Sequence, residues 1–276
     1  MLIDAHIHCS GRENTGQVLR ALDGAGVDFA VLLAPFLEKD YRLDDAASLR
    51  RANAHLAALV SGHRDRLCGL AVVDPSEPDA PRDLRQAIED LGLSGAKMVP
   101  SGWYPDDPRV QPTFAVASAL RLPLLFHSGV FIDGRSSRFC RPAFFEVLRD
   151  HPGARVTLAH LGWPWTDEAI GVGLIDLING VAADAAQFRF DLSFGAPPVY
   201  RRETVGKALA VLGPGLLQFG SDCFLPCAAG DLLARRSALV EVLDALDVAA
   251  AAREQIFGAT AAAWLGPAFS GRHAWR

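Results

Sequence analysis

The sequence predicts one α/β domain, spanning residues 1–276, that folds as a closed parallel (β/α)8 barrel. Short, nearly all-apolar segments alternate with longer amphipathic segments, and eight such pairs fill the chain without a Ser/Gly-rich linker. Strands of a parallel sheet are apolar on both faces, because helices cover each side of the sheet. A doubly wound open sheet is the alternative. It is typically marked by a G-x-G-x-x-G turn after the first strand, and the sequence has none there.

Eight apolar segments are the expected strands. Each is short and nearly all apolar, as a strand covered on both faces should be. In chain order they cover residues 2–7, 27–34, 67–73, 95–99, 122–127, 155–160, 188–193 and 216–222.

The segments between the strands carry the signals of amphipathic helices. In the first, Val18, Leu19 and Leu22 share one face, and later segments begin at a capping Asp or at Pro142. A last segment with no strand after it predicts an extra C-terminal helix. The expected helices cover 14–26, 44–62, 79–92, 140–153, the segment after 165, 201–215, the stretch after 230, and 250–266.

Composition and charge exclude several classes of protein. The formal net charge of −5 argues against broad, charge-driven binding of nucleic acid. No apolar run approaches the roughly 18 residues needed to cross a membrane, and the opening MLIDAHIH lacks the basic start of a secretory leader. The five scattered cysteines indicate reduced thiols. We therefore expect a cytoplasmic protein that binds neither nucleic acid nor membrane.

Four of the eight histidines lie in or at the ends of expected strands: His6 and His8 in the first, His127 in the fifth, His160 in the sixth. Side chains alternate faces along a strand, so His6 and His8 point to the same side. Asp222 ends the eighth strand, and the carboxyl ends of barrel strands form the floor of one active site. Imidazole and carboxylate groups that converge there predict a transition-metal site.

The motifs that carry these residues, DAHIH, LLFHSG, TLAHLG and FGSD, are similar to those of the amidohydrolase superfamily of TIM barrels. The longer phrases RPAFFEVLRDHPGARVTLAHLGWPW and LLQFGSD resemble its amidohydrolase-related branch. That branch includes aminocarboxymuconate-semialdehyde decarboxylase and several lactone and aromatic-acid enzymes. The resemblance runs over essentially the whole chain.

This resemblance implies that His6, His8, His127 and Asp222 hold one divalent metal, which is usually zinc in that branch. It also implies that His160 lies outside the ligand set and can contact bound water or substrate. The ligand types alone also allow Mn²⁺, Fe²⁺ or Co²⁺, because imidazole with carboxylate does not select zinc.

Lys97, in the fourth expected strand, leaves the number of metals open. Some superfamily members carry a carbamylated lysine there that bridges two metals, and His160 would then become a ligand of the second. Alternatively, Lys97 binds an anion of the substrate, or it only packs or forms an ion pair.

Asp222 and His160 are the expected catalytic residues. A bound metal can lower the pKa of water towards about 7. Asp222 can accept a proton from that water, and His160 can orient the water or shuttle a proton. The same groups can support loss of CO2 from an acid anchored at the metal.

The loops after the strands contain aromatic and basic residues that suit a planar or cyclic carboxylate. The arginines among them could instead pair with nearby acids, and the tryptophans could only pack. The expected substrate contacts are Lys97, Trp103, Arg138, Arg141 and Trp163.

We therefore expect a metal-dependent hydrolase that uses a metal-activated water on a small carboxylated cyclic lactone, ester or amide. A metal-dependent, non-oxidative decarboxylase of an aromatic or muconate-type acid is the alternative. A non-catalytic binding barrel is the alternative of another class. The expected partner is a small anionic substrate. The apolar segment 261–269 could pair two chains as a homodimer or cap the barrel from outside.

Overall fold

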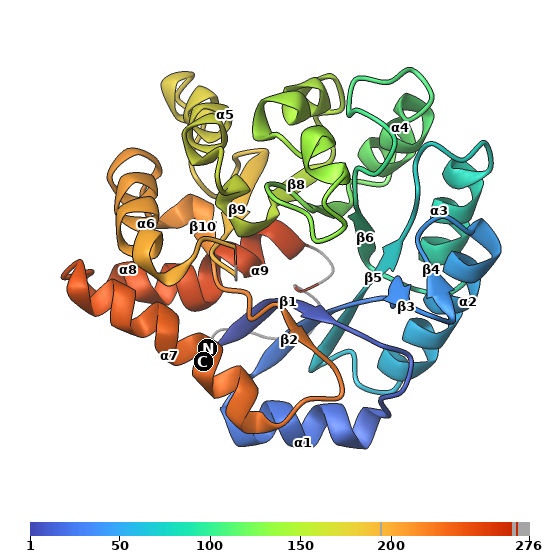
Figure 1. The fold of residues 1–276 in the computed structure, drawn as a ribbon, viewed down its shortest axis with the longest axis horizontal. Coiled ribbons are helices and arrows are strands. Elements are labelled where there is room, and N and C mark those ends of the chain that lie inside the picture. Colours follow the sequence, from blue (N-terminus) through green and yellow to red (C-terminus); the bar gives the residue numbers. More distant parts are fainter. Residues whose placement is uncertain (194, 267–268, 270–276) are drawn as a thin grey trace.

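The computed structural model describes residues 1–193, 195–266 and 269, and it shows a parallel sheet rolled into a barrel with helices outside it (Figure 1). The strands follow the spatial order β10-β9-β8-β7-β6-β5-β2-β1-β11. All eight expected strands are present. Their bounds are β1 Ile3–His8, β2 Phe29–Leu33, β5 Leu67–Val72, β6 Gly95–Met98, β7 Pro123–Phe126, β8 Arg155–Leu158, β9 Phe188–Asp191 and β10 Leu217–Gln218, with β11 at Cys223–Phe224.

The last strand is divided, and its two parts close the barrel. β10 pairs with β9, whereas β11 pairs with β1. Between them, the carbonyl of Phe219 accepts a hydrogen bond of 3.1 Å from the peptide nitrogen of Ala5. The first strand of the chain is thus joined to both neighbours, and the closed (β/α)8 barrel is confirmed rather than the open sheet.

Helices cover the outside of the barrel, as Figure 1 shows. Their apolar faces and the outward faces of the strands form one continuous core. None of the described helices is long and apolar enough to cross a lipid bilayer. The α-helices are α1 Thr15–Ala25, α2 Ala46–Val60, α3 Ala80–Glu89, α4 Gln111–Ala119, α5 Thr166–Ile178, α6 Pro198–Leu212, α7 Ala229–Ala245, α8 Ala250–Glu254 and α9 Thr260–Leu265.

Three local elements differ from the prediction. Residues 37–42 form a small antiparallel hairpin of β3 (Leu37–Glu38) and β4 (Tyr41–Arg42). Helix α4 is unexpected because its sequence QPTFAVASA is apolar on nearly every side and shows no stripe. The segment 140–153 forms a tighter 3-10 helix at Pro142–Asp150 instead of an α-helix, and such helices suit short pieces.

The extra C-terminal helix is confirmed, and it closes the end of the barrel opposite the carboxyl ends of the strands. Trp264 on α9 is fully buried, and its indole nitrogen donates to the carbonyl of Arg155, where β8 begins. Together with Leu265 it packs against residues of β1 and β2. Pro267 and Ala268, in the segment considered for pairing two chains, lie outside the described residues.

Candidate metal centre and adjoining cavity

Three ligand-type side chains, His6, His8 and Asp222, meet at the carboxyl ends of the strands. Nε2 of His8 lies 3.1 Å from Nε2 of His6 and 3.1 Å from Oδ1 of Asp222. Nε2 of His6 lies 3.4 Å from the same oxygen. Ligand atoms about 2.0–2.2 Å from one tetrahedral ion are separated by roughly 3.3 Å. The arrangement therefore fits a single divalent metal.

A backbone hydrogen bond fixes the position of this cluster, and burial shifts the pKa values of its side chains. Asp222 has a positive φ of 56°, and its peptide nitrogen donates to the carbonyl of His6 over 2.8 Å, which fixes it against β1. Burial lowers the pKa values of His6 and His8, which favours the neutral rings that can bind a cation. Burial alone would raise the pKa of Asp222, but His6 and His8 hold it far below its usual range.

Asp191, at the end of β9, orients the first of these histidines. Its Oδ2 lies 2.8 Å from Nδ1 of His6, and both side chains are fully buried. This contact places the ring proton on Nδ1 and leaves Nε2 free to bind a cation. Burial opposes the charge of Asp191, yet the two neighbouring histidines and Ser193 hold its pKa well below the usual range. A fixed negative charge therefore stands behind His6.

His160 follows β8 and is held in an unusual backbone conformation. Its φ is 60° and that of Leu161 is 48°, in the left-handed region that side chains seldom adopt. The peptide nitrogen of His160 donates to Oδ1 of Asp191 over 2.8 Å, and the hydroxyl of Ser193 lies 2.8 Å from its Nδ1. A Cβ at Gly195 would lie 2.5 Å from Cβ of His160, so the adjoining loop needs glycine there. The ring stacks beside His6 with its Nε2 unused by these contacts.

His127 lies in the same cavity but outside the cluster. Its Nε2 lies 3.0 Å from the carbonyl oxygen of Val130, and its ring centre is 5.0 Å from that of His160. Among the described residues, His127 belongs to neither group of three ligand atoms that lie within 4.8 Å of one another. Its role as a metal ligand therefore stays a prediction.

Lys97 points into the cavity from β6. Its side chain is 1% exposed, and Nζ has no hydrogen-bond partner among the described residues. Burial disfavours the ammonium form and lowers the pKa of Lys97 to about 8. A buried amine with unused donors is ready to contact an anion that enters the cavity.

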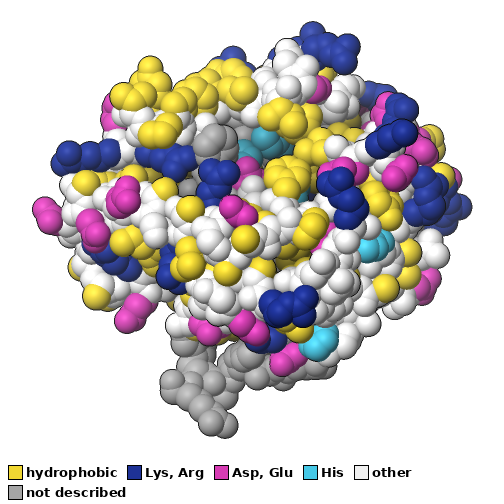
Figure 2. Space-filling model, turned by 60° about the horizontal axis from the view of Figure 1, so that its bottom comes forward, with side chains coloured by type: hydrophobic (Ala, Val, Ile, Leu, Met, Phe, Trp, Pro, Cys, Tyr) yellow, Lys and Arg dark blue, Asp and Glu magenta, His cyan; other side chains and the backbone are white. Residues whose placement is uncertain are grey.

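The cluster opens into a cavity of about 390 Å³. Figure 2 shows histidine side chains in a hollow with hydrophobic side chains gathered around it. The polar lining consists of ligand-type residues and two cations, and the remaining walls are mostly apolar. The lining residues include His8, Phe36, Leu37, Lys97, His127, Val130, Phe131, Ile132, His160, Trp163, Asp222, Phe224 and Arg235.

The structure places two of the five expected substrate contacts in the cavity and three outside it. Lys97 and Trp163 line the cavity. Trp103 is 1% exposed and packs in the core against α4, so the prediction of a substrate contact is wrong for it. Arg138 and Arg141 are exposed and do not line the cavity either.

Both of these arginines are engaged elsewhere. Arg138 lies over the ring of Phe139, 4.7 Å from its centre. Arg141 pairs with Glu168 and lies over Trp165. The alternative stated for the arginines, pairing with a nearby acid, is therefore what the structure shows for Arg141, whereas Arg138 packs on an aromatic ring.

Three residues of the site were not predicted: Asp191, Ser193 and Arg235. Asp191 lies within the seventh expected strand, FRFDLS, and it ends the shorter β9 of the structure. A carboxylate within an otherwise mostly apolar expected strand was therefore the available signal. Arg235 lies on α7 and reaches the cavity from a helix, where nothing in the sequence distinguishes it from other surface arginines.

Comparison with known proteins agrees with this fold. The amidohydrolase family model matches residues 3–266, so the chain belongs to the amidohydrolase family. No curated protein matches the sequence.

Solved structures with the same fold include decarboxylases that act on aromatic acids. One is 5-carboxyvanillate decarboxylase LigW from Sphingomonas paucimobilis, at 18% identity and a TM-score of 0.68, covering 96% of this chain and 98% of that one. Another is a dihydroxybenzoic acid decarboxylase from Polaromonas with bound manganese, at 15% identity and a TM-score of 0.68, covering 96% of each chain. An uncharacterised TIM-barrel protein from Bordetella bronchiseptica has 18% identity and a TM-score of 0.71, covering 97% of this chain and 99% of that one. At these identities the likeness shows the fold alone.

Proposed function

We propose that the protein is a divalent-metal-dependent decarboxylase of a planar, aromatic type of acid. The observation that carries the proposal is the three-residue cluster of His6, His8 and Asp222, which opens into an apolar cavity that also contains Lys97. Decarboxylases of 5-carboxyvanillate and dihydroxybenzoate are among the similar structures, and they favour this alternative over the hydrolase expected first.

His6, His8 and Asp222 would hold the metal, and His127 is the proposed fourth ligand. The donor set allows zinc, the ion expected from the sequence, and equally manganese, which is bound in the Polaromonas structure. When bound, a divalent ion supplies positive charge that anchors an acidic substrate oxygen and can lower the pKa of water.

Residues around the cluster then orient the substrate. A flat ring fits between apolar and aromatic walls that include Trp163 and Phe224. The buried Lys97 can pair with a carboxylate or phenolate oxygen, because its donors have no other described partner. The apolar walls exclude water from the reacting carbon and strengthen these contacts.

Loss of CO2 needs one proton at the carbon that carried the carboxylate. The bond to the carboxyl carbon breaks, its electron pair remains on the ring carbon, and a proton forms the new C–H bond there. His160 is the proposed donor of this proton. Its Nδ1 is engaged with Ser193, so Nε2 is the ring atom that would first take up a proton from solvent and then pass it to the ring carbon. Asp222 lies in the same cavity and is the second group that can carry it.

Hydrolysis of a lactone, ester or amide is the second candidate. The observation in its favour is the family itself, since the model that matches is that of amidohydrolases. The same cluster and His160 could position and deprotonate a water molecule. A non-catalytic barrel is less well supported, because the buried donor set is complete enough to bind a cation.

The deciding experiment loads the protein with manganese or zinc and offers two panels of compounds. The first panel contains hydroxybenzoic and carboxyvanillic acids, with CO2 release measured. The second contains carboxylated lactones, esters and amides, with acid release measured. We expect turnover in the first panel, and none in an Asp222→Asn variant. Turnover confined to the second panel would overturn the decarboxylase in favour of the hydrolase.

A matched control distinguishes loss of the centre from general damage. His63 lies in the loop after α2 and does not line the cavity. His63→Ala should keep both metal and activity. If neither panel is turned over by metal-loaded protein, the catalytic proposal fails and the binding barrel becomes the better account.

A further inference from the structure

The mouth of the main cavity is apolar and open to water. Four large hydrophobic side chains both line the cavity and are exposed, and we call them the apolar rim: Leu37, Val130, Ile132 and Phe224. Ile132 has an exposed fraction of 82%. Arg235 is the other exposed side chain of the described lining. Exposed apolar side chains that gather around one hollow are typical of a binding groove, whereas scattered ones are common on any surface.

The apolar rim is built from three separate segments of the chain. Leu37 belongs to β3, which follows β2, whereas Val130 and Ile132 lie in the loop after β7 and Phe224 belongs to β11. Loops beyond the carboxyl ends of barrel strands form the active sites of such folds. The rim is therefore a property of the cavity as a whole and not of one loop.

The rim is continuous with the candidate metal centre. The ring of Phe224 stacks on that of His8, with centres 4.5 Å apart and planes 7° from parallel. On the other side, the carbonyl oxygen of Val130 lies 3.0 Å from Nε2 of His127. A molecule that is bound at the cluster and is longer than one ring must therefore pass along these side chains.

The volume of the cavity exceeds what a single ring fills. The cavity offers about 390 Å³. A cavity of roughly 150 Å³ is enough to bind benzene, so a ring with its carboxylate would leave about half of the space unfilled. The substrate of this cavity should therefore carry a further group.

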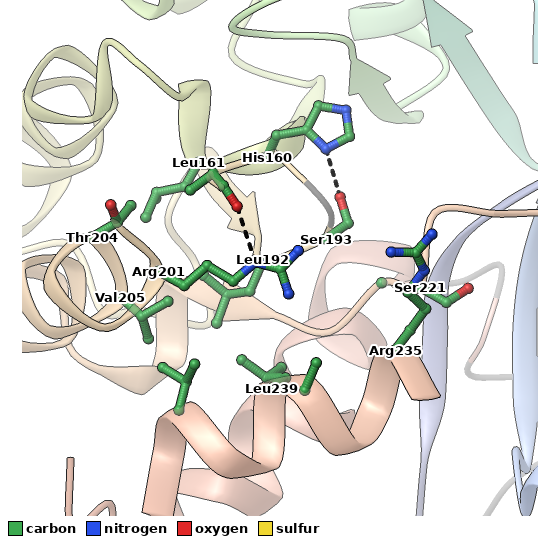
Figure 3. Close-up of a pocket in the computed structure, with 14 residues that line it drawn as sticks. His160, Leu161, Leu192, Ser193, Arg201, Thr204, Val205, Ser221, Arg235 and Leu239 are labelled. Carbon is green, nitrogen blue, oxygen red and sulfur yellow. Dashed lines mark hydrogen bonds between the residues drawn. The ribbon is translucent and has the colours of Figure 1, made fainter. Parts of the chain in front are cut away.

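The space behind His160 is too small for that group. A second pocket, between the end of β9 and the helices α6 and α7, shares His160 with the main cavity. Figure 3 shows Ser193 hydrogen-bonded to the His160 ring at its edge. This pocket offers about 40 Å³, which is room for only about three water molecules at roughly 10–15 Å³ each. A larger group must therefore extend outward, along the apolar rim.

We propose that the apolar rim binds an uncharged, apolar substituent on the ring of the substrate, so that the protein acts on alkyl- or aryl-substituted aromatic acids. The inference rests on the function proposed above, in which the ring and its carboxylate lie at the cluster. Contact between the substituent and the rim removes apolar surface of both from water, which favours binding. A small hydroxybenzoate would reach the centre but would leave the rim exposed.

Binding of non-reacting acids to metal-loaded protein tests the proposal without turnover. The probes are benzoate, the meta and para isomers of butylbenzoate, and the corresponding hydroxypropylbenzoates, whose chains have the same length. Calorimetry measures the dissociation constants. We expect at least one butylbenzoate to bind at least about tenfold more tightly than benzoate, because burial of about two methylene groups already gives that factor. The matching hydroxypropylbenzoate should gain less, since its hydroxyl group would have to leave water.

Variants assign the extra affinity to the rim. The quantity to compare is the ratio of the dissociation constants of benzoate and the preferred butylbenzoate. Ile132→Asn should lower this ratio by about threefold or more, and Leu37→Asn, from a different segment, should lower it too. Ile178→Asn is the matched control, because Ile178 ends α5, is 69% exposed and does not line the cavity. Its ratio should equal that of wild type.

The outcomes separate this proposal from the one on which it rests. If benzoate binds only in the presence of metal but neither butylbenzoate binds more tightly, the rim proposal is overturned and the proposed function stands. Equal gains for butyl and hydroxypropyl chains would also overturn it. Failure of benzoate to bind the metal-loaded protein would instead count against the proposed function. Sedimentation tests another occupant: a dimer that dissociates in Ile132→Asn but not in Ile178→Asn would show that a second copy covers the rim, against the proposal.

Discussion

The carboxylate of Asp191 lies 2.8 Å from Nδ1 of His6, the ring atom that does not face Asp222. The other oxygen of Asp191 accepts the peptide N–H of His160. One buried carboxylate thus orients both a residue of the cluster and the proposed proton donor. Its position explains how His160 keeps a strained backbone next to the centre.

Asp191→Asn should weaken metal binding by about 10-fold to 100-fold, because the partner that fixes the His6 ring loses its charge. Competition with a chelator measures the dissociation constant. Asp176→Asn is the control, since Asp176 is also buried but pairs with Arg149, away from the cluster. This control should lower thermal stability and leave metal affinity unchanged. Equal metal affinity in wild type and Asp191→Asn would contradict the orienting role.

The cluster of His6, His8 and Asp222 predicts how much metal the protein contains. Elemental analysis should find about one divalent ion per chain, and His8→Ala or Asp222→Asn should reduce it to near zero. His127→Ala tests the one proposed ligand that the structure keeps apart from the cluster. A partial loss of metal is expected there, and full retention would remove His127 from the ligand set.

The Lys97→Met variant distinguishes two possible roles of the buried amine, binding of an anion and bridging of two metals. As an anion-binding group, its loss should weaken binding of an aromatic acid by about 10-fold to 100-fold while one metal per chain remains. Calorimetry and elemental analysis measure the two quantities. Two metals in wild type, falling to one or none in the variant, would show instead that Lys97 is a carbamylated bridging ligand.

The buried carboxylate of Glu13 should make the free energy of unfolding depend on pH. Burial would raise its pKa, but hydrogen bonds from His55 and from Ser10 lower it from 4.5 to about 2. Since the folded pKa is the lower one, ionised Glu13 stabilises the fold above pH 4.5, and that contribution is lost as pH falls towards 2. Glu13→Gln should therefore lower the free energy of unfolding at pH 7 by up to about 3 kcal/mol.

Acid and urea unfolding followed between pH 7 and 2 checks this contribution. The variant should show a flatter dependence on pH below 5 than wild type. Glu89→Gln is the control, because Glu89 forms an exposed pair with Arg85 and should change little. The same pH dependence in wild type and Glu13→Gln would refute the assignment.

Two tryptophans should behave in opposite ways. Trp163→Ala removes part of the cavity wall and should raise the KM for an aromatic acid about threefold to tenfold with little change in stability. Trp103→Ala leaves a hole in the core and should destabilise the fold by about 3–5 kcal/mol. Steady-state kinetics and urea unfolding of both variants measure the contrast. A rise in KM for Trp103→Ala alone would restore it as a substrate contact.

Much of the barrel is predictable because buried parallel strands are short apolar runs. The residues of the cluster are also predictable, since strand alternation places His6 and His8 on one side and Asp222 ends the last strand. Helix α4 was missed because a segment that is apolar on nearly all sides gives no periodic signal. The split of the last strand at 219–222 was missed because it depends on hydrogen bonds to the first strand.

The side chains that approach the site from loops and helices were the least predictable. Arg138 and Arg141 follow a strand and carry the right charge, but Phe139, Glu168 and Trp165 engage them outside the cavity. Arg235 reaches the cavity from α7 because of the way this helix packs in the fold. Such placements depend on tertiary packing, which spacing along the chain does not encode.

The junction between the first and last strands, which closes the barrel, has a consequence for biosynthesis. His8 and Asp222 are 214 residues apart in sequence, and the hydrogen bonds from Ala5 and Asp222 join the first strand to the last. A nascent chain on the ribosome can expose His6 and His8 early, but it cannot complete the centre until Asp222 has been synthesised. If these three residues hold an ion, its incorporation must follow translation of nearly the whole barrel, and the ion would then link the first strand to the last.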